Sequence, residues 1–69
     1  VARALLQRAA RRQQGVVIGY VDAAGVATRR RVRPLAVHGG QLMAWDPAQG
    51  RPREFAVHRV TSVMSADEG

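Results

Sequence analysis

The chain has 69 residues, no cysteine and a formal net charge of +6, with eleven basic residues against five acidic ones. A chain of this length buries only about 60% of its unfolded surface, so we expect a single domain, residues 1–69, without room for a deep catalytic cleft. The lack of cysteine argues against a disulfide-stabilised secreted domain and favours the cytoplasm, and no stretch resembles a membrane span or a signal peptide.

Residues 1–14 are predicted to form a helix, because their apolar side chains recur at the spacing of one helical face. Arg11 and Arg12 fall in the last turn, where positive charge suits the helix dipole, and Gly15 is the residue expected just after the helix end. This placement needs no ligand, so we interpret the helical arginines as a solvated face. The chain starts at Val1 rather than methionine, and we take it as a fragment of a longer protein.

From residue 16 onwards the apolar residues alternate with a period of two, which is typical of strands. The strands are expected to be separated by tight turns that contain glycine, or aspartate followed by proline. Pro34 shifts the alternation inside the long second strand, which predicts an edge, a bend or a bulge. The expected strands cover 16–22, 27–37, 41–45, 53–58 and 60–64, and residues 65–69 are expected to fray.

This order of elements predicts a mainly β, small α+β fold, with an N-terminal helix followed by a five-stranded antiparallel sheet. Closing such a sheet into an SH3-like or Sm-like barrel, over about residues 16–64, would remove strand edges that a small domain can hardly leave exposed. No internal repeat, linker or low-complexity segment interrupts it.

All eleven basic residues are arginines. A GC-rich genome can produce this usage, but guanidinium groups also form bidentate hydrogen bonds with phosphate, and a high positive charge favours a polyanionic partner such as nucleic acid. His38 and His58 alone do not make a metal centre, and we expect no metal and no cofactor. Ser62 and Ser65 have no evident base nearby in the sequence, so the sequence does not favour an enzyme.

Several motifs occur in a characteristic order. The segment from Ile18 to Tyr20 is followed by Arg-x-Val-x-Pro-Leu, which begins at Arg30, and Arg-x-Phe-x-hydrophobic-x-Arg-hydrophobic begins at Arg53. Together they resemble the WYL domain family, named for a Trp-Tyr-Leu triplet, over roughly residues 4–64. The combination is most similar to the C-terminal segments of actinobacterial helicase-associated proteins. Where the family has its triplet, this chain reads Gly40-Gln41-Leu42 and keeps only the leucine.

The resemblance implies an Sm-like barrel of five strands that acts as a sensing or binding module attached to bacterial transcription regulators, nucleases or helicases. It implies binding of nucleic acid, often single-stranded, or of a nucleotide-like ligand through family arginines, which are Arg30, Arg53 and Arg59 here. The incomplete triplet puts any function of its aromatic pair in doubt. His58 stands where many members have aspartate, and Trp45 where relatives often have tyrosine.

Two interpretations of Arg53 and Arg59 stay open. The alternation of residues 53–58 places both at the ends of one strand face, where they could hold phosphates at the barrel rim. In that case the free protein would hold two like charges without partners, and replacing both with glutamine should leave stability unchanged or raise it. Alternatively, Arg53 pairs with Glu54 or Asp46, Arg59 bonds a backbone carbonyl, and both are structural.

Further candidates lie on the second and third strands. Arg31 and Arg33 share one strand face with Arg29, while Arg30 lies on the opposite face with Val32. Arg29, Arg31 and Arg33 form either a solvated face or an anion site. Tyr20, Trp45 and His58 are candidates for stacking or for the rim. The alternative is the core, which is favoured for Tyr20 and stays open for Trp45.

The sequence therefore favours a nucleic-acid-binding or nucleic-acid-sensing accessory domain of a bacterial DNA-processing or regulatory protein. The expected partners are nucleic acid, preferably single-stranded, or a nucleotide-like anion, and other domains of the parent protein, with no membrane. Two alternatives stay open: a protein-interaction or dimerisation module whose basic face serves solubility, and a sensor of a small nucleotide.

Overall fold

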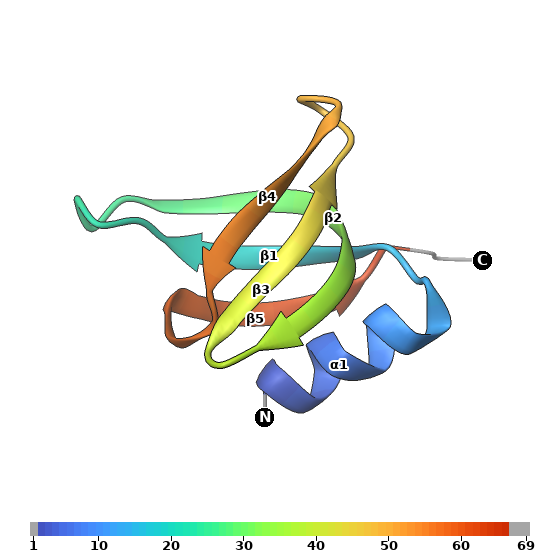
Figure 1. Cartoon of the computed structure of the whole chain (residues 1–69). Helices are drawn as coiled ribbons and strands as arrows, with labels where there is room; N and C mark the ends of the chain where they lie inside the picture. Colours follow the sequence, from blue (N-terminus) through green and yellow to red (C-terminus); the bar gives the residue numbers. More distant parts are fainter. Residues whose placement is uncertain (1, 67–69) are drawn as a thin grey trace.

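The computed structural model describes residues 2–66 and shows one helix followed by a strongly bent sheet (Figure 1). The elements within this range are α1 Ala2–Arg12, β1 Val16–Val21, β2 Ala27–His38, β3 Gln41–Asp46, β4 Arg51–Ala56, η1 Val57–Arg59 and β5 Val60–Ser65. Here η1 is a short 3-10 helix between the last two strands. The predicted small α+β fold with a five-stranded antiparallel sheet is confirmed.

The five strands lie in the order β4-β3-β2-β1-β5. β2 belongs to both halves of the sheet, because Val32 pairs with Val16 of β1 whereas the next residue, Arg33, pairs with Trp45 of β3. The sheet bends around β2 into a partly open barrel (Figure 1). Between the edge strands β4 and β5, the described residues form no ladder.

A β-bulge interrupts the pairing of β2 with β3 where the sequence alternation shifts. Pro34 pairs with Ala44 and Ala36 pairs with Met43, so Leu35 is the extra residue and its side chain is exposed. A bulge accommodates proline, which has no amide to give to a ladder. The irregularity predicted at Pro34 is confirmed, and the bend it adds lets one strand serve both halves of the barrel.

The turns follow from local side-chain chemistry. Gly39 and Gly40 have φ of 52° and 82° and form the two-residue loop between β2 and β3, a conformation that glycine adopts without strain. At the β1–β2 turn, the Asp22 carboxylate accepts hydrogen bonds from the Ala24 and Val26 amides, each at 2.9 Å. Such an aspartate fixes the turn from within.

α1 packs against β2 and β5 and covers one end of the barrel (Figure 1). Leu6 and Ala9 are the helical residues that enter the core. Leu5, which the helical spacing also placed on the apolar face, is exposed. The buried stripe is therefore narrower than the sequence predicted, because α1 contacts the barrel along one side only. The other core residues come from the sheet: Val16, Ile18, Val32, Leu42, Ala44, Phe55 and Val60.

The helix is shorter than predicted, and Gly15 is not its terminating residue. Gln13 has φ of 54°, its amide donates to the Ala10 carbonyl, and the Gln14 amide donates to the Ala9 carbonyl at 2.9 Å. This pair of bonds is the Schellman arrangement, in which the residue in the left-handed conformation is usually glycine. The predicted start of the helix at Val1 lies outside the described residues.

Replacing Gln13 with glycine is expected to raise the free energy of unfolding by about 0.5–1 kcal/mol. A glutamine in the left-handed conformation is strained, whereas glycine is not, and the relief exceeds the extra unfolded-state entropy of glycine. Urea denaturation measures the change. Gln14→Gly is the control, because Gln14 is not in the left-handed region, and it should give no gain. Equal effects of both substitutions would contradict this account.

The region after β4 also differs from the prediction. Strand pairing ends at Ala56, and the Val57 amide donates to the Gly40 carbonyl at 2.9 Å as η1 begins. His58 is thus an exposed residue of a 3-10 turn rather than a strand residue. The turn is needed because the chain must cross from one edge of the sheet to the other. The fraying predicted for residues 65 and 66 is wrong, since Ser65 belongs to β5 and the Ala66 amide donates to the Gly15 carbonyl. The rest of the predicted tail, 67–69, lies outside the described residues.

Candidate anion-binding site

A buried carboxylate holds two arginines together at the end of β3. Asp46 is 1% exposed, and its Oδ2 atom lies 3.5 Å from the Arg53 guanidinium and 3.8 Å from that of Arg30. Its Oδ1 atom accepts hydrogen bonds from the Ala48 and Gln49 amides of the β3–β4 turn. Asp46 is therefore saturated by backbone donors on one side and by cations on the other. We call Asp46, Arg30 and Arg53 the Asp46 cluster.

The three members come from three strands. Arg30 lies on β2 on the face of the buried Val32, as the alternation predicted, and Arg53 lies on β4 two residues from the buried Phe55. Asp46 ends β3 between them. Two guanidinium groups against one carboxylate leave the cluster with a net positive charge. The side chains of Arg30 and Arg53 are 36% and 29% exposed, so part of each guanidinium can reach a ligand in solvent.

Aromatic rings support the cluster from inside the barrel. The Arg53 guanidinium carbon lies 5.5 Å from the centre of the Phe55 ring, within the range of a cation–π contact. Tyr20 meets Phe55 edge to face, with ring centres 5.2 Å apart. The Tyr20 hydroxyl oxygen accepts a hydrogen bond from the Ala56 amide and so links β1 to β4 across the barrel opening. Tyr20 is thus half-buried and packed against the core.

The bonding partners of Arg59 are backbone carbonyls outside the Asp46 cluster. Its guanidinium donates to the backbone carbonyls of Asp22, at 2.9 Å, and Val21, at 3.5 Å. These bonds attach η1 to the end of β1 and the turn that follows it. Arg53 and Arg59 each have partners in the folded chain, and the contacts are those of the structural alternative: a carboxylate for Arg53 and carbonyls for Arg59.

The premise that Arg53 and Arg59 lie on one strand face without partners is therefore wrong. The face is interrupted because η1 begins at Val57, which turns the backbone out of the strand conformation before Arg59 is reached. The carbonyl partners of Arg59 lie 37 and 38 residues away in the sequence, where local alternation does not reveal them, whereas Asp46 is seven residues from Arg53. Whether these residues also bind an anion stays a prediction.

The opposite face of β2 carries the remaining candidates. Arg29, Arg31 and Arg33 are exposed, as the alternation predicted. Arg31 donates to the Ala66 carbonyl at 3.2 Å, whereas Arg33 has no side-chain hydrogen bond or ion pair within residues 2–66. Trp45, which pairs with Arg33 across the strands, is 39% exposed. Trp45 thus lies on the outer face of the barrel and not in its core.

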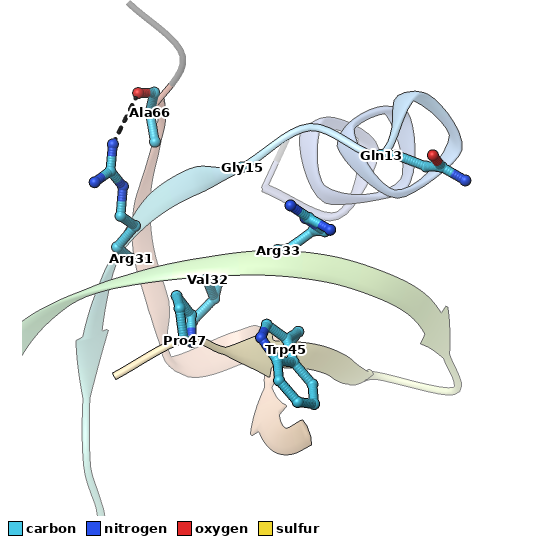
Figure 2. Close-up of a pocket in the computed structure, with 8 residues that line it drawn as sticks. All are labelled: Gln13, Gly15, Arg31, Val32, Arg33, Trp45, Pro47 and Ala66. Atoms are coloured by element: carbon cyan, nitrogen blue, oxygen red, sulfur yellow. Dashed lines mark hydrogen bonds between the residues drawn. The ribbon is translucent and has the colours of Figure 1, made fainter. Parts of the chain in front are cut away.

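Arg31, Arg33 and Trp45 border a hollow of about 260 Å³ (Figure 2). In the figure, Arg31 and Arg33 extend to one side of β2, and Trp45 and Pro47 lie along the other. We call this hollow the outer groove, and its lining consists of Gln13, Gly15, Arg31, Val32, Arg33, Trp45, Pro47 and Ala66. The predicted site residues of β2 thus separate: Arg30 lies on the inner face as part of the Asp46 cluster, whereas Arg31 and Arg33 lie on the outer face.

Sequence reasoning assigned Asp46 to a turn and considered it as a partner of Arg53, but missed its role as the centre of the cluster. The available signal was its position directly after a strand and before Pro47, where one carboxylate oxygen is used by the turn and the other is free.

Among residues 2–66, no group of three histidine, cysteine or acidic side chains is placed to hold a metal ion. In the same range, no helix has the length and apolar character needed to cross a bilayer.

Comparison with known proteins agrees with the fold. The family model of the WYL domain matches residues 2–64. Among solved structures, the chain is similar to the proteasome accessory factor B/C (PafBC) of Arthrobacter aurescens, with a TM-score of 0.87 and 22% sequence identity. This similarity covers 99% of the present chain and 11% of the PafBC chain, and at this identity it shows a shared fold. No curated protein matches the chain.

Proposed function

The chain belongs to the WYL domain family, and from this premise we propose that it is a nucleic-acid-sensing accessory domain of a bacterial regulatory or DNA-processing protein. The observation that carries the proposal is the Asp46 cluster, in which two partly exposed guanidinium groups converge on one buried carboxylate. Their outward donors suit phosphate oxygens, which accept charged hydrogen bonds at short distance. This is a binding role and requires no catalytic group.

The net charge of +6 supports the same proposal. Long-range attraction by such a charge raises the encounter rate with a polyanion, while the positions of particular arginines decide where the backbone lies. Arg30 and Arg53 are the proposed phosphate contacts. Arg59 is a third proposed contact through the guanidinium donors that its bonds to the Val21 and Asp22 carbonyls leave free. Attachment to a helicase-associated protein is part of the proposal too and rests on the motif resemblance.

Replacing Arg30 with glutamine is expected to weaken binding of a fluorescently labelled single-stranded oligonucleotide by about tenfold or more, because one charged hydrogen bond is lost. The slope of log affinity against log salt should become shallower by about 0.7, the value for one phosphate contact on a single strand. Arg30 is the informative choice because its contact with Asp46 is the longer of the two, so the fold should tolerate the change better. Fluorescence anisotropy at several salt concentrations measures both quantities.

Arg3→Gln is the matched control. It removes the same charge from an exposed position on α1, away from the cluster. If both variants weaken binding equally, the net charge and not the cluster determines affinity. If the unmodified chain does not bind the oligonucleotide at 50 mM salt, the proposal fails for this domain. A parallel thermal-shift series with mononucleotides tests the alternative of a small nucleotide ligand at the same arginines.

A further inference from the structure

β5 is an edge of the sheet that lacks the usual protection against pairing with another chain. It pairs with β1 on one side, and within the part of the chain that the structure describes no strand pairs with its other side. Its six residues, Val60–Ser65, include no charged residue and no proline. A bulge at Thr61 lies near its start, and residues 62–65 pair with β1 in regular register. Charges and proline are what keep exposed edges from adding a strand, so this edge is open to one.

A groove of about 180 Å³ is lined by residues of α1 and of this edge strand. Leu5, Arg8, Ala9 and Arg12 line it from α1, at the spacing of one helical face, and Val63 lines it from β5. The volume is below the range of ~300–1,000 Å³ that is typical of small-molecule sites, so the groove suits a single side chain. Because Leu5 is 41% exposed, an apolar side chain placed there would remove apolar surface from water.

The charges at the groove select an acidic occupant. Arg8 and Arg12 are exposed and have no side-chain hydrogen bond or ion pair within residues 2–66. Among the described residues, no acidic side chain lines the groove. A second copy of the chain would bring a second pair of the same arginines, and each copy carries a net charge of +6. Like charges therefore disfavour pairing of β5 with itself, whereas carboxylates on the added strand would be attracted.

We propose that β5 accepts, as an added strand, an extended acidic segment of a partner protein with the pattern apolar-x-acidic-x-acidic. Alternate residues share one face of a strand, so the three pattern residues would all point toward α1. The apolar side chain would contact Leu5 and Val63, and the two carboxylates would pair with Arg8 and Arg12. Alternate residues of a strand lie about 6.6 Å apart, close to the rise of about 6 Å between Arg8 and Arg12 along the helix. This inference goes beyond the proposed function, since none of its residues belongs to the Asp46 cluster.

A labelled peptide, Thr-Leu-Thr-Glu-Thr-Glu-Thr, tests the proposal by fluorescence anisotropy with the whole chain. Replacing both Arg8 and Arg12 with glutamine should weaken its binding about tenfold, because two ion pairs are lost. The matched control is Arg3→Gln with Arg11→Gln, which removes the same charge from the same helix outside the groove and should have only the smaller effect of net charge. Replacing the leucine of the peptide with serine should also weaken binding about tenfold. Circular dichroism checks the fold of both double variants.

Two N-methylated forms of the peptide test whether it binds as a strand. In an added strand, alternate backbone amides face β5 and the others face away from it. Methylating the amides that face β5 should abolish binding, whereas methylating the other set should change affinity by less than about threefold. Equal effects of the two sets would overturn strand addition at this edge.

Other results would also overturn the proposal. Equal weakening by the two double arginine variants would mean that net charge alone attracts the peptide. Equal binding of a peptide with lysine in place of both glutamates would contradict the charge argument, and so would no binding at about 1 mM peptide. A dimer of the chain that the peptide does not dissociate, measured by sedimentation, would assign the edge to a second copy. None of these results changes the salt slope expected for Arg30→Gln, so the proposed function is tested separately.

Discussion

Replacing Asp46 with asparagine is expected to lower the free energy of unfolding by about 2–3 kcal/mol. Removing one member of a buried ion pair typically costs about 3–5 kcal/mol, and the partial exposure of Arg30 and Arg53 reduces this figure. Asparagine keeps an oxygen for the Ala48 and Gln49 amides, so the turn is retained and the substitution isolates the charge. Its amide nitrogen, however, would face two guanidinium groups that can only donate.

Urea denaturation of the Asp46→Asn variant measures this loss, and Asp22→Asn is its control. Asp22 makes the same kind of turn, with two backbone amides on one carboxylate oxygen, but its carboxylate forms no ion pair within the described residues. We expect a change below about 0.5 kcal/mol there. Similar losses in both variants would mean that the turn, and not the ion pairs, determines the loss in the free energy of unfolding.

In the folded Asp46→Asn variant, oligonucleotide binding should tighten, since Arg30 and Arg53 no longer have an internal anion.

Replacing both Arg53 and Arg59 with glutamine is expected to lower the free energy of unfolding by about 2–3 kcal/mol. Each substitution removes charged hydrogen bonds: one between Arg53 and the buried Asp46 carboxylate, the others from Arg59 to the Val21 and Asp22 carbonyls. Such bonds contribute about 1.5–3 kcal/mol each, less where they are partly exposed. Relief of repulsion between two unpartnered charges would have raised stability, but the structure gives both arginines partners.

The same double variant also tests binding. If both arginines contact phosphate as proposed, the salt slope should become shallower by about 1.4, at 0.7 per contact. The control is Arg3→Gln with Arg51→Gln, which removes two exposed arginines whose only side-chain bond within residues 2–66 joins Arg51 to Gln49. Thermal and urea melts are compared with salt titrations. If the free energy of unfolding is unchanged and the salt slope is shallower, Arg53 and Arg59 act as two charges without internal partners that bind phosphate. If the free energy of unfolding falls and the salt slope is unchanged, both residues are purely structural.

Local patterns predicted the features that depend on neighbours in sequence. Alternation placed Arg30 on the inner face of β2 and Arg31 and Arg33 on the outer face, and the shift at Pro34 predicted the bulge. Glycine pairs and aspartates marked the turns because their backbone and side-chain chemistry acts within four residues. The predicted strand faces, bulge and turns are confirmed because no distant contact competes with the local backbone preference at these positions.

Features that depend on distant segments were missed. The sequence could not show that Arg59 bonds the end of β1, or that Asp46 faces both Arg30 and Arg53, because those contacts form only when the sheet bends and its strands pair. The helix end was misplaced for a related reason. Gly15 is the residue that local preference selects, but the path into β1 requires the left-handed turn at Gln13, two residues earlier.

The position of Pro52 in β4 bears on how this chain behaves at high concentration. β4 is an edge of the sheet, and Pro52 pairs with Trp45 on its inner side while lacking an amide hydrogen of its own. An edge with a missing donor is a poor template for a strand of another copy, and Arg51 and Arg53 on either side of the proline would bring like charges together. β4 therefore resists the edge-to-edge growth that leads from open sheets to aggregates, so the barrel can stay open without a second chain to cover this strand.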